Sequence, residues 1–199
     1  MQSTIETPFA RYEREDMDEA LRVLRSGGVI LYPTDTIWGL GCDATCSAAV
    51  RRIYSIKHRQ DTKAMLCLLD GAGKLQGYMQ EVPEQAYELI ELATRPLTII
   101  YPHAKGVAAE LLGEDGSLGI RITREPFTHA LCERLRHPLV STSANLSGEP
   151  SPKVFKDIAE ELKSQVDYIV RYRQDDTRES APSSIIKLDV GGVIKIIRP

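Results

Sequence analysis

The sequence lacks any excess of positive charge. Its 199 residues carry 25 Lys and Arg against 28 Asp and Glu, which gives a formal net charge of −3. A chain-wide basic field of the kind that holds nucleic acid non-specifically is therefore absent, although a local basic patch is compatible with this balance. Long apolar runs are also missing: the longest have about five residues, whereas a membrane-spanning helix needs about 20. The polar, acidic start has no apolar segment of a secretion signal, so we expect a cytoplasmic protein without membrane contact.

Cysteine and histidine are too few and too scattered to predict a zinc site. The four cysteines form no C-x-x-C pair, and the four histidines do not supply the missing ligands. Thiols spaced in this way fit a reducing compartment, where they pack as small apolar side chains. We therefore expect no metal bound by protein ligands and no metal role for any cysteine. The cysteines are Cys42, Cys46, Cys67 and Cys132.

What remains is an ordinary globular composition, with 42% hydrophobic and 27% charged residues. The length predicts a single domain over residues 1–199. Helical and extended patterns alternate along the chain, which indicates an α/β fold with a mixed parallel and antiparallel sheet. Asp16 is expected to cap the first helix, and 171–180 is expected to be a charged, mobile loop. We expect helices over 16–26, 47–57, 83–92, 126–135 and 152–164, and strands over 29–32, 65–69, 97–101, 118–122, 138–143, 184–188 and 193–197.

A first polar segment, Tyr-Pro-Thr-Asp-Thr-Ile-Trp-Gly-Leu-Gly, occupies 32–41 directly after a predicted buried strand. Its glycines begin a weak match to the dinucleotide-binding fingerprint, but the turn between strand and helix is too long for that site. One interpretation is a loop whose glycines only permit tight turns. The other is that the hydroxyls of Thr34 and Thr36, two residues apart in extended chain, face one side of a cleft.

A second candidate is the cation pair Lys57 and Arg59. On the preceding helix Val50, Ile53 and Lys57 share one face, so Lys57 continues an apolar stripe. If the helix ends there, Lys57 and Arg59 point to the same side and could bind a phosphate or carboxylate. The alternative is a solvated helix end at which lysine complements the helix dipole.

A third candidate is Pro-Leu-Val-Ser-Thr-Ser-Ala-Asn-Leu-Ser-Gly at 138–148. A predicted strand ends here in alternating polar residues, and Ser141, Ser143 and Asn145 share one face at a period of two. Small polar side chains at the end of a strand commonly hold a ligand in α/β sheets. An ordinary loop of capping residues is the alternative.

Taken together, these segments resemble the YrdC family. The motifs are Tyr-Pro-Thr-Asp-Thr-x-x-Gly-Leu-Gly at 32–41, Lys-x-Arg at 57–59, Gly-Ile-Arg at 119–121, Ser-x-Ser-Ala-Asn-x-Ser-Gly at 141–148, Pro-Ser-Ser at 182–184 and Ile-Arg-Pro at 197–199. They occur in the family's order and cover nearly the whole chain. The sequence departs from the family pattern at 60–65 and at 94–96, where the family often has further prolines, and we expect no second domain of the kind found in the longer members.

The resemblance implies a twisted α/β sheet with flanking helices and a deep, positively lined cleft. It also implies a nucleotidyltransferase, L-threonylcarbamoyladenylate synthase, which uses L-threonine, bicarbonate and ATP with Mg²⁺ and releases pyrophosphate. A downstream threonylcarbamoyl-transferase system then modifies tRNA. By matching position, the family's catalytic, nucleotide-handling residues are Lys57, Arg59, Ser143 and Asn145. Ser141 and Arg198 join them at ATP, and the threonine pocket contains Thr34, Arg121, Ser141 and Ser183. Lys63, outside the motif, is expected to matter little.

Three alternatives stay open at this point. The chain could be a YciO-type paralogue that binds nucleotide or RNA but has little synthase activity, and the altered stretch at 60–65 leaves room for this. It could be a double-stranded-RNA-binding module that uses a basic concave surface, although the net charge opposes this as a primary role. It could also be a carbamoyl-transfer domain that uses carbamoyl phosphate, a type usually found inside a longer chain.

Overall fold

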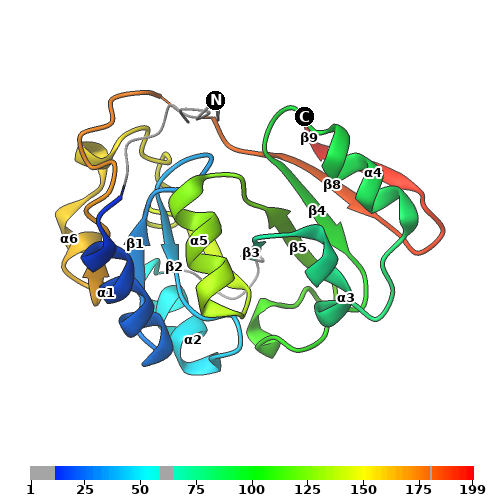
Figure 1. The fold of residues 1–199 in the computed structure, drawn as a ribbon, viewed down its shortest axis with the longest axis horizontal. Coiled ribbons are helices and arrows are strands. Elements are labelled where there is room, and N and C mark those ends of the chain that lie inside the picture. Colours follow the sequence, from blue (N-terminus) through cyan, green and yellow to red (C-terminus); the bar gives the residue numbers. More distant parts are fainter. Residues whose placement is uncertain (1–11, 59–64, 180) are drawn as a thin grey trace, which may run out of the picture.

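The computed structural model describes residues 12–58, 65–179 and 181–199. Within these ranges the chain forms a nine-stranded sheet flanked by helices (Figure 1). The helices are α1 (Arg14–Arg25), α2 (Ser47–Ile56), α3 (Leu75–Tyr78), α4 (Glu84–Leu92), α5 (Pro126–Leu135) and α6 (Glu160–Lys163), with 3-10 turns at Ala72–Lys74, Ala109–Leu111 and Phe155–Asp157. The strands are β1 (Ile30–Tyr32), β2 (Gly39–Gly41), β3 (Leu66–Leu69), β4 (Leu97–Tyr101), β5 (Leu118–Ile122), β6 (Leu139–Ser143), β7 (Tyr168–Ile169), β8 (Ser184–Leu188) and β9 (Ile194–Arg198).

The sheet is mixed, which confirms the predicted class. Its strands lie in the order β7-β1-β2-β6-β3-β5-β4-β8-β9. The pairs β1·β7, β3·β5 and β4·β8 are parallel, and the other five neighbouring pairs are antiparallel. Strands far apart in sequence are therefore neighbours, and β4, β5, β8 and β9 bring residues 98, 121, 184 and 198 to one half of the sheet.

The sheet is buried on both faces at β1, where helices cover each side. Side chains alternate along a strand, so neighbouring residues of β1 point to opposite faces. Ile30 and Tyr32 point to the face covered by α1 and α5, while Leu31 points to the face covered by α2. Val50 and Ile53 on α2 are fully buried, and the predicted stripe that leads to Lys57 is therefore real. This packing fixes the end of α2 against the sheet.

Most predicted bounds are confirmed within one or two residues, and those of β4, β5 and α5 are identical to the prediction. These elements combine a period-two or period-3.6 apolar pattern with clear start signals. In α5, Pro126 occupies the first turn and the Glu125 side chain accepts a hydrogen bond from the Thr128 N–H (2.7 Å).

The helix predicted over 152–164 is wrong. The structure has a 3-10 turn at Phe155–Asp157 and a short α6, and the backbone between them is extended at Ile158 and Ala159. Val154, Ile158 and Leu162 all point inward. Their spacing of four imitates a helical stripe, although the chain reaches these positions through two separate turns.

The N-cap role predicted for Asp16 is also wrong. Helix α1 begins at Arg14, and Asp16 is only 1% exposed. Its carboxylate accepts hydrogen bonds from the Tyr168 hydroxyl (2.7 Å) and from the N–H groups of Arg171 and Tyr172. Asp16 thus anchors the segment after β7 to α1. The 171–180 segment forms the predicted loop, of which residues 171–179 are described.

Two strands, β2 and β7, are absent from the prediction. Glycine is disfavoured in strands, so Gly39-Leu40-Gly41 reads as a loop. In the structure β2 lies between β1 and β6, and a Cβ on Gly41 would lie 2.5 Å from the Tyr32 ring and 2.7 Å from the Val140 carbonyl oxygen. Glycine is therefore needed here for close approach of three strands, not for a turn.

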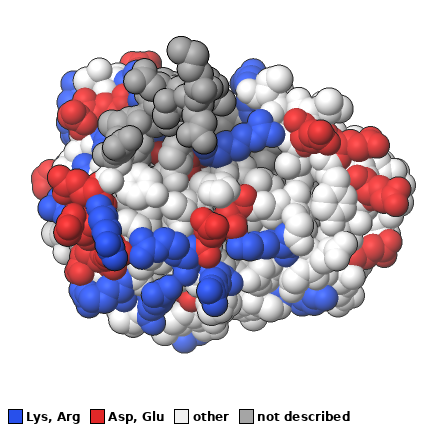
Figure 2. Space-filling model, viewed as in Figure 1, with Lys and Arg blue, Asp and Glu red and all other residues white. Residues whose placement is uncertain are grey.

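Basic side chains gather on the lower part of one face, where α1 and α5 end (Figures 1 and 2). Arg22, Arg25 and Arg134 lie in the last turns of these helices, where cations complement the helix dipole. Arg22 is paired with Glu19 and Arg134 with Asp18. Among the helices of the described residues, none is long and apolar enough to cross a membrane.

Candidate active site

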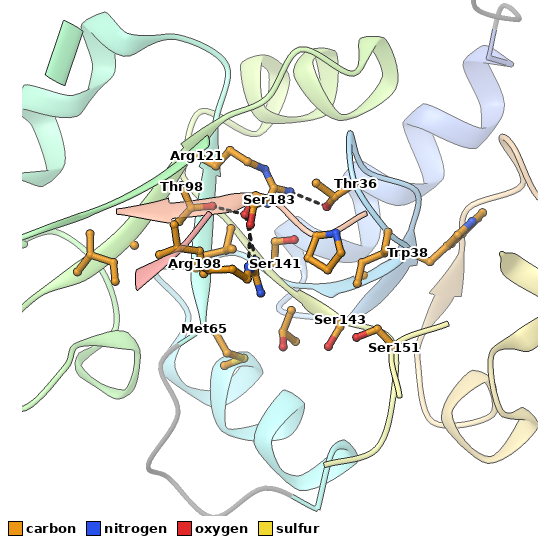
Figure 3. A pocket seen from close by; sticks show the side chains of 18 of the residues that line it. Thr36, Trp38, Met65, Thr98, Arg121, Ser141, Ser143, Ser151, Ser183 and Arg198 are labelled. Carbon is orange, nitrogen blue, oxygen red and sulfur yellow. Dashed lines mark hydrogen bonds between the residues drawn. The ribbon is translucent and has the colours of Figure 1, made fainter. Parts of the chain in front are cut away.

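A cavity of about 320 Å³ lies over one face of the sheet (Figure 3). Strands β2 to β6, β8 and β9 all contribute to its wall. Of the described residues that line it, none is acidic, and two are arginines, Arg121 and Arg198. The charged residues that line the cavity within the described ranges are thus both cations. The polar side chains that line it are Thr36, Thr98, Ser117, Arg121, Ser141, Thr142, Ser143, Ser151, Ser183 and Arg198.

Arg121, on β5, is the most deeply buried cation of this cavity, with 3% exposure. Its Nη2 lies 2.9 Å from Asp35 Oδ1 and donates a hydrogen bond to Thr36 Oγ1 (3.3 Å). Its Nε is buried and has no hydrogen-bond partner within the described part of the chain. Arg121 thus brings to the cavity wall a buried guanidinium with an unsatisfied N–H group, and a guanidinium favours a carboxylate as its ligand.

The segment between β1 and β2 carries the two predicted hydroxyls. Thr34 Oγ1 and Thr36 Oγ1 lie 3.0 Å apart, and Thr34 Oγ1 also accepts the Thr36 N–H and donates to the Ile37 carbonyl. Thr36 lines the cavity, but Thr34 lies behind it, so only one of the two faces the space. Arg173 donates to the Thr34 carbonyl (3.1 Å) from the loop after β7.

A hydrogen-bonded group of three residues forms the wall at β4, β8 and β9. Thr98 Oγ1 lies 2.9 Å from Ser183 Oγ, and Arg198 Nε donates to the Ser183 carbonyl (2.8 Å). Figure 3 shows these side chains converging beside Ser141. Burial lowers the pKa of Arg198, and the nearby charge of Arg121 acts in the same direction. Two guanidinium groups share one cavity, which favours an anionic ligand.

The opposite wall is formed by the end of β6 and the loop that follows. Ser141 and Ser143 line the cavity, whereas Lys57 and Asn145 lie behind it. Lys57 is 3% exposed, and its Nζ donates to the backbone carbonyls of Ser143 and Asn145 (2.6 Å to the latter). The prediction that Lys57 is buried is therefore confirmed. Lys57 does not line the cavity itself, because these carbonyls hold its ammonium group.

Asn145 has one unsatisfied group. Its amide nitrogen donates to the carbonyls of Leu146 and Glu149, and its Oδ1 is buried without a partner among residues 12–58, 65–179 and 181–199. The site thus offers one oxygen acceptor behind the β6 wall. Arg59 and Lys63 lie outside the described residues. No cluster of three or more His, Cys, Asp or Glu side chains suited to a metal occurs among the residues described.

Sequence reasoning missed Thr98, Asp35 and Arg173. Thr98 stands in an apolar strand, and only the pairing of β4 with β5 places it directly opposite Arg121. The sequence signal that could have identified Thr98 is a polar residue inside a predicted buried, apolar strand. Asp35 lies between two predicted site residues in the 32–41 motif, but spacing alone does not reveal its partner.

Comparisons with known proteins identify the family of this chain. The family model Sua5_yciO_yrdC, described as telomere recombination, matches residues 22–199. A threonylcarbamoyl-AMP synthase of Nitrosococcus oceani is 35% identical over 152 residues, which are 76% of this chain and 82% of that protein.

Two solved structures are similar to the whole fold. One is E. coli YciO, with a TM-score of 0.82 and 27% identity over 96% of this chain and 91% of that one. The other is P. abyssi Sua5 complexed with L-threonine, with a TM-score of 0.81 and 26% identity over 90% of this chain and 52% of that one. With a family match over most of its length and a relative at this identity, the chain belongs to the Sua5/YciO/YrdC family.

Proposed function

We propose that this chain is a threonylcarbamoyl-AMP synthase, a nucleotidyltransferase that converts L-threonine, bicarbonate and ATP into threonylcarbamoyl-adenylate and pyrophosphate. The observation that carries the proposal is Arg121, a buried guanidinium whose Nε has no partner in the described ranges and which lines a cavity without acidic residues. Relatives bear the name threonylcarbamoyl-AMP synthase, and a similar Sua5 structure holds L-threonine. Both support this assignment.

In this proposal the arginine side of the cavity binds threonine. Arg121 pairs with the amino-acid carboxylate, because a guanidinium fork matches a carboxylate in shape and charge. Ser183 and Ser141 supply hydroxyls beside it, and the predicted Thr34 acts through the hydrogen bond that it shares with Thr36. A pocket that hydrogen-bonds the threonine hydroxyl rejects analogues lacking it, since its own polar groups would be left unpaired.

The proposed reaction needs alignment and charge neutralisation more than a strong base. The threonine amine combines with bicarbonate, which gives a carbamate and water. A carbamate oxygen then attacks the α-phosphorus of ATP, and the bond from that phosphorus to the pyrophosphate breaks. Lys57, Arg59 and Arg198 stabilise the phosphate charge in this proposal, while Ser143 and Asn145 orient the phosphates. A closed cavity also protects the labile carbamate from water.

The residues present fit Mg²⁺ as a companion of the triphosphate. Hard cations prefer oxygen ligands, and Mg²⁺ commonly keeps several waters and substrate phosphates. Asn145 Oδ1, buried and without a partner in the ranges that the structure covers, is a neutral oxygen of this kind, and the Ser143 hydroxyl lies two residues away. When bound, the ion neutralises phosphate charge.

The product is a mixed anhydride that a second enzyme system must consume. We propose a threonylcarbamoyl-transferase system acting on tRNA as that partner, with the cytoplasm as the location. Direct binding of tRNA or double-stranded RNA stays a prediction. The basic groups at the ends of α1 and α5 are largely explained by ion pairs and helix dipoles.

Pyrophosphate release from ATP tests the proposal. The expected result is release that requires both L-threonine and bicarbonate and falls strongly when serine or glycine replaces threonine. Equal release with any amino acid, or with none, would contradict the synthase assignment. Nucleotide binding without threonine-dependent release would favour the YciO-type alternative.

A further inference from the structure

Asp35 is a largely buried carboxylate that lies beside the cavity. It follows Thr34 on the segment between β1 and β2, and its side chain is 12% exposed. It does not line the 320 Å³ cavity. Its nearest cation is Arg121, with 2.9 Å between Asp35 Oδ1 and Arg121 Nη2. Asp35 therefore contacts the residue that faces the ligand space, not the ligand space itself.

The contact uses only one nitrogen of Arg121. Asp35 and Thr36 both lie against Nη2, while Nε has no hydrogen-bond partner in the described part of the chain. A guanidinium is planar, so contacts of Nη2 with both Asp35 and Thr36 restrict the orientation of the whole group. Asp35 thus helps to set how Arg121 lies at the cavity wall.

Asp35 itself is held by its neighbours along the chain. Thr34 Oγ1 accepts the Thr36 N–H (3.0 Å) and donates to the Ile37 carbonyl (2.8 Å), which closes a tight turn around Asp35. Arg173 donates to the Thr34 carbonyl from outside (3.1 Å). The carboxylate is therefore placed by a rigid backbone and does not need Arg121 to order it.

A second hollow lies beside Asp35, away from the first cavity. It has a volume of about 210 Å³ and is lined by Asp35, Arg124 and the end of α4. Burial raises the pKa of Asp35, and the charge of Arg121 opposes this rise. The charged form of the carboxylate is thus favoured by Arg121, and without that charge the guanidinium would keep only its hydrogen bond to Thr36 at Nη2.

We propose that Asp35 is a positioning residue for substrate binding: it holds Arg121 at Nη2, so that the guanidinium stays at the cavity wall, where it receives the carboxylate of an amino acid. This inference rests on the proposed function for the identity of the ligand. Its geometric part concerns Arg121 alone and can be tested separately.

The test is Asp35→Asn, which keeps the shape of the side chain and removes its charge. We expect the dissociation constant for L-threonine, measured by calorimetry, to rise about tenfold, the loss of roughly one well-oriented charged hydrogen bond. The dissociation constant for ATP should change less than about twofold, because Asp35 does not reach the opposite wall. The matched control is Asp167→Asn, which disrupts an Asp–Arg pair with Arg52 far from the cavity.

A second readout does not depend on threonine. The buried Nε–H proton of Arg121 should exchange slowly in the ¹⁵N spectrum of the wild type and faster in Asp35→Asn, whereas Asp167→Asn should leave it unchanged. Unchanged exchange in Asp35→Asn would overturn the inference, as would equal weakening of threonine and ATP binding. If the wild-type protein binds no threonine, the proposed function fails, and the exchange rates still decide whether Asp35 orients Arg121.

Discussion

The two walls of the cavity are built in different ways. One, which we call the arginine wall, consists of Thr98, Arg121, Ser183 and Arg198 on or beside regular strands. The other, the β6 wall, consists of Ser141 and Ser143, with Lys57 and Asn145 behind them. In the arginine wall most of the polar contacts join two side chains, as between Thr98 and Ser183, and Arg198 also donates to a backbone carbonyl. In the β6 wall the buried ammonium group bonds to backbone carbonyls of a loop.

This difference indicates which wall is ready for its ligand. The arginine wall already holds its guanidinium groups through side-chain and backbone partners, so a small carboxylate meets ordered cations. In the β6 wall two loop carbonyls hold the Lys57 ammonium group, so the position of Lys57 relative to a bound phosphate depends on this loop. We infer that threonine binds in a preformed pocket, whereas the nucleotide-binding site takes its final arrangement only when the nucleotide binds.

The largest effect is expected on the β6 wall. Lys57→Ala should lower kcat about a hundredfold, or ~3 kcal/mol, because a buried cation that stabilises phosphate charge is lost. The melting temperature should fall as well, since the carbonyls of Ser143 and Asn145 lose a donor. Steady-state kinetics and calorimetry measure the two effects.

The control is Lys187→Ala, which removes a lysine paired with Asp115 on the surface and should leave kcat unchanged. Retention of most activity in Lys57→Ala would show that the nucleotide is handled elsewhere, for instance by the stretch around Lys63.

On the arginine wall, Arg121→Lys should raise KM for threonine about thirtyfold, or ~2 kcal/mol, with a smaller change in kcat. Lysine keeps the charge next to Asp35 but loses the planar fork that matches a carboxylate. The KM for ATP should stay near the wild-type value. A larger effect on ATP than on threonine would reverse the assignment of the two walls.

The sequence predicts these two residues unequally well. The position of Arg121 follows from strand 118–122, whose bounds are confirmed, and the burial of Lys57 follows from the apolar stripe Val50, Ile53, Lys57. The partners of Lys57 do not follow, because they are backbone atoms of a chain segment about 90 residues away in sequence. Local patterns give the direction of a side chain, whereas its contacts depend on which strands become neighbours.

The same limit explains the errors in the fold. Strand β2 has two glycines for close approach and therefore no local strand signal, and the inward spacing of Val154, Ile158 and Leu162 imitates a helix. Thr98 is missed for a related reason: its strand was predicted, but only the β4–β5 register sets it opposite Arg121.

Thr98 offers a finer comparison within the arginine wall. Thr98→Val keeps the shape and removes the hydroxyl that lies 2.9 Å from Ser183 Oγ. We expect KM for threonine to rise about fivefold, or ~1 kcal/mol, the net value of one buried hydrogen bond. Thr98→Ser should restore most of the affinity. If the serine variant were as weak as the valine variant, packing of the methyl group and not the hydroxyl would be responsible.

The smallest expected effect concerns Asp176, which supports the arginine wall from outside. Its carboxylate accepts from Arg178 Nη2 (2.7 Å) and from Arg173 Nε (3.0 Å), and Arg173 in turn donates to the Thr34 carbonyl. The hydrogen bond from Arg178 is the largest influence that holds the pKa of Asp176 well below the ordinary aspartate value. Since the unfolded chain then binds the proton more readily, this carboxylate stabilises the fold above about pH 4, and the contribution is lost as the pH falls below that value.

Asp176→Asn should therefore lower the melting temperature by about 2 °C at pH 7, a small amount because Arg178 is exposed. The difference between wild type and variant should begin to shrink as the pH falls below about 4, and it should vanish only as the pH falls through the much lower pKa of Asp176 in the folded state. Threonine affinity at pH 7 should fall less than about twofold, because Arg173 keeps its contact with Glu125 and its bond to Thr34. If the difference in melting temperature stayed constant or grew as the pH fell, the arginine partners would not be what keeps Asp176 charged. Arg173 alone would then have to hold the Thr34 carbonyl behind the arginine wall.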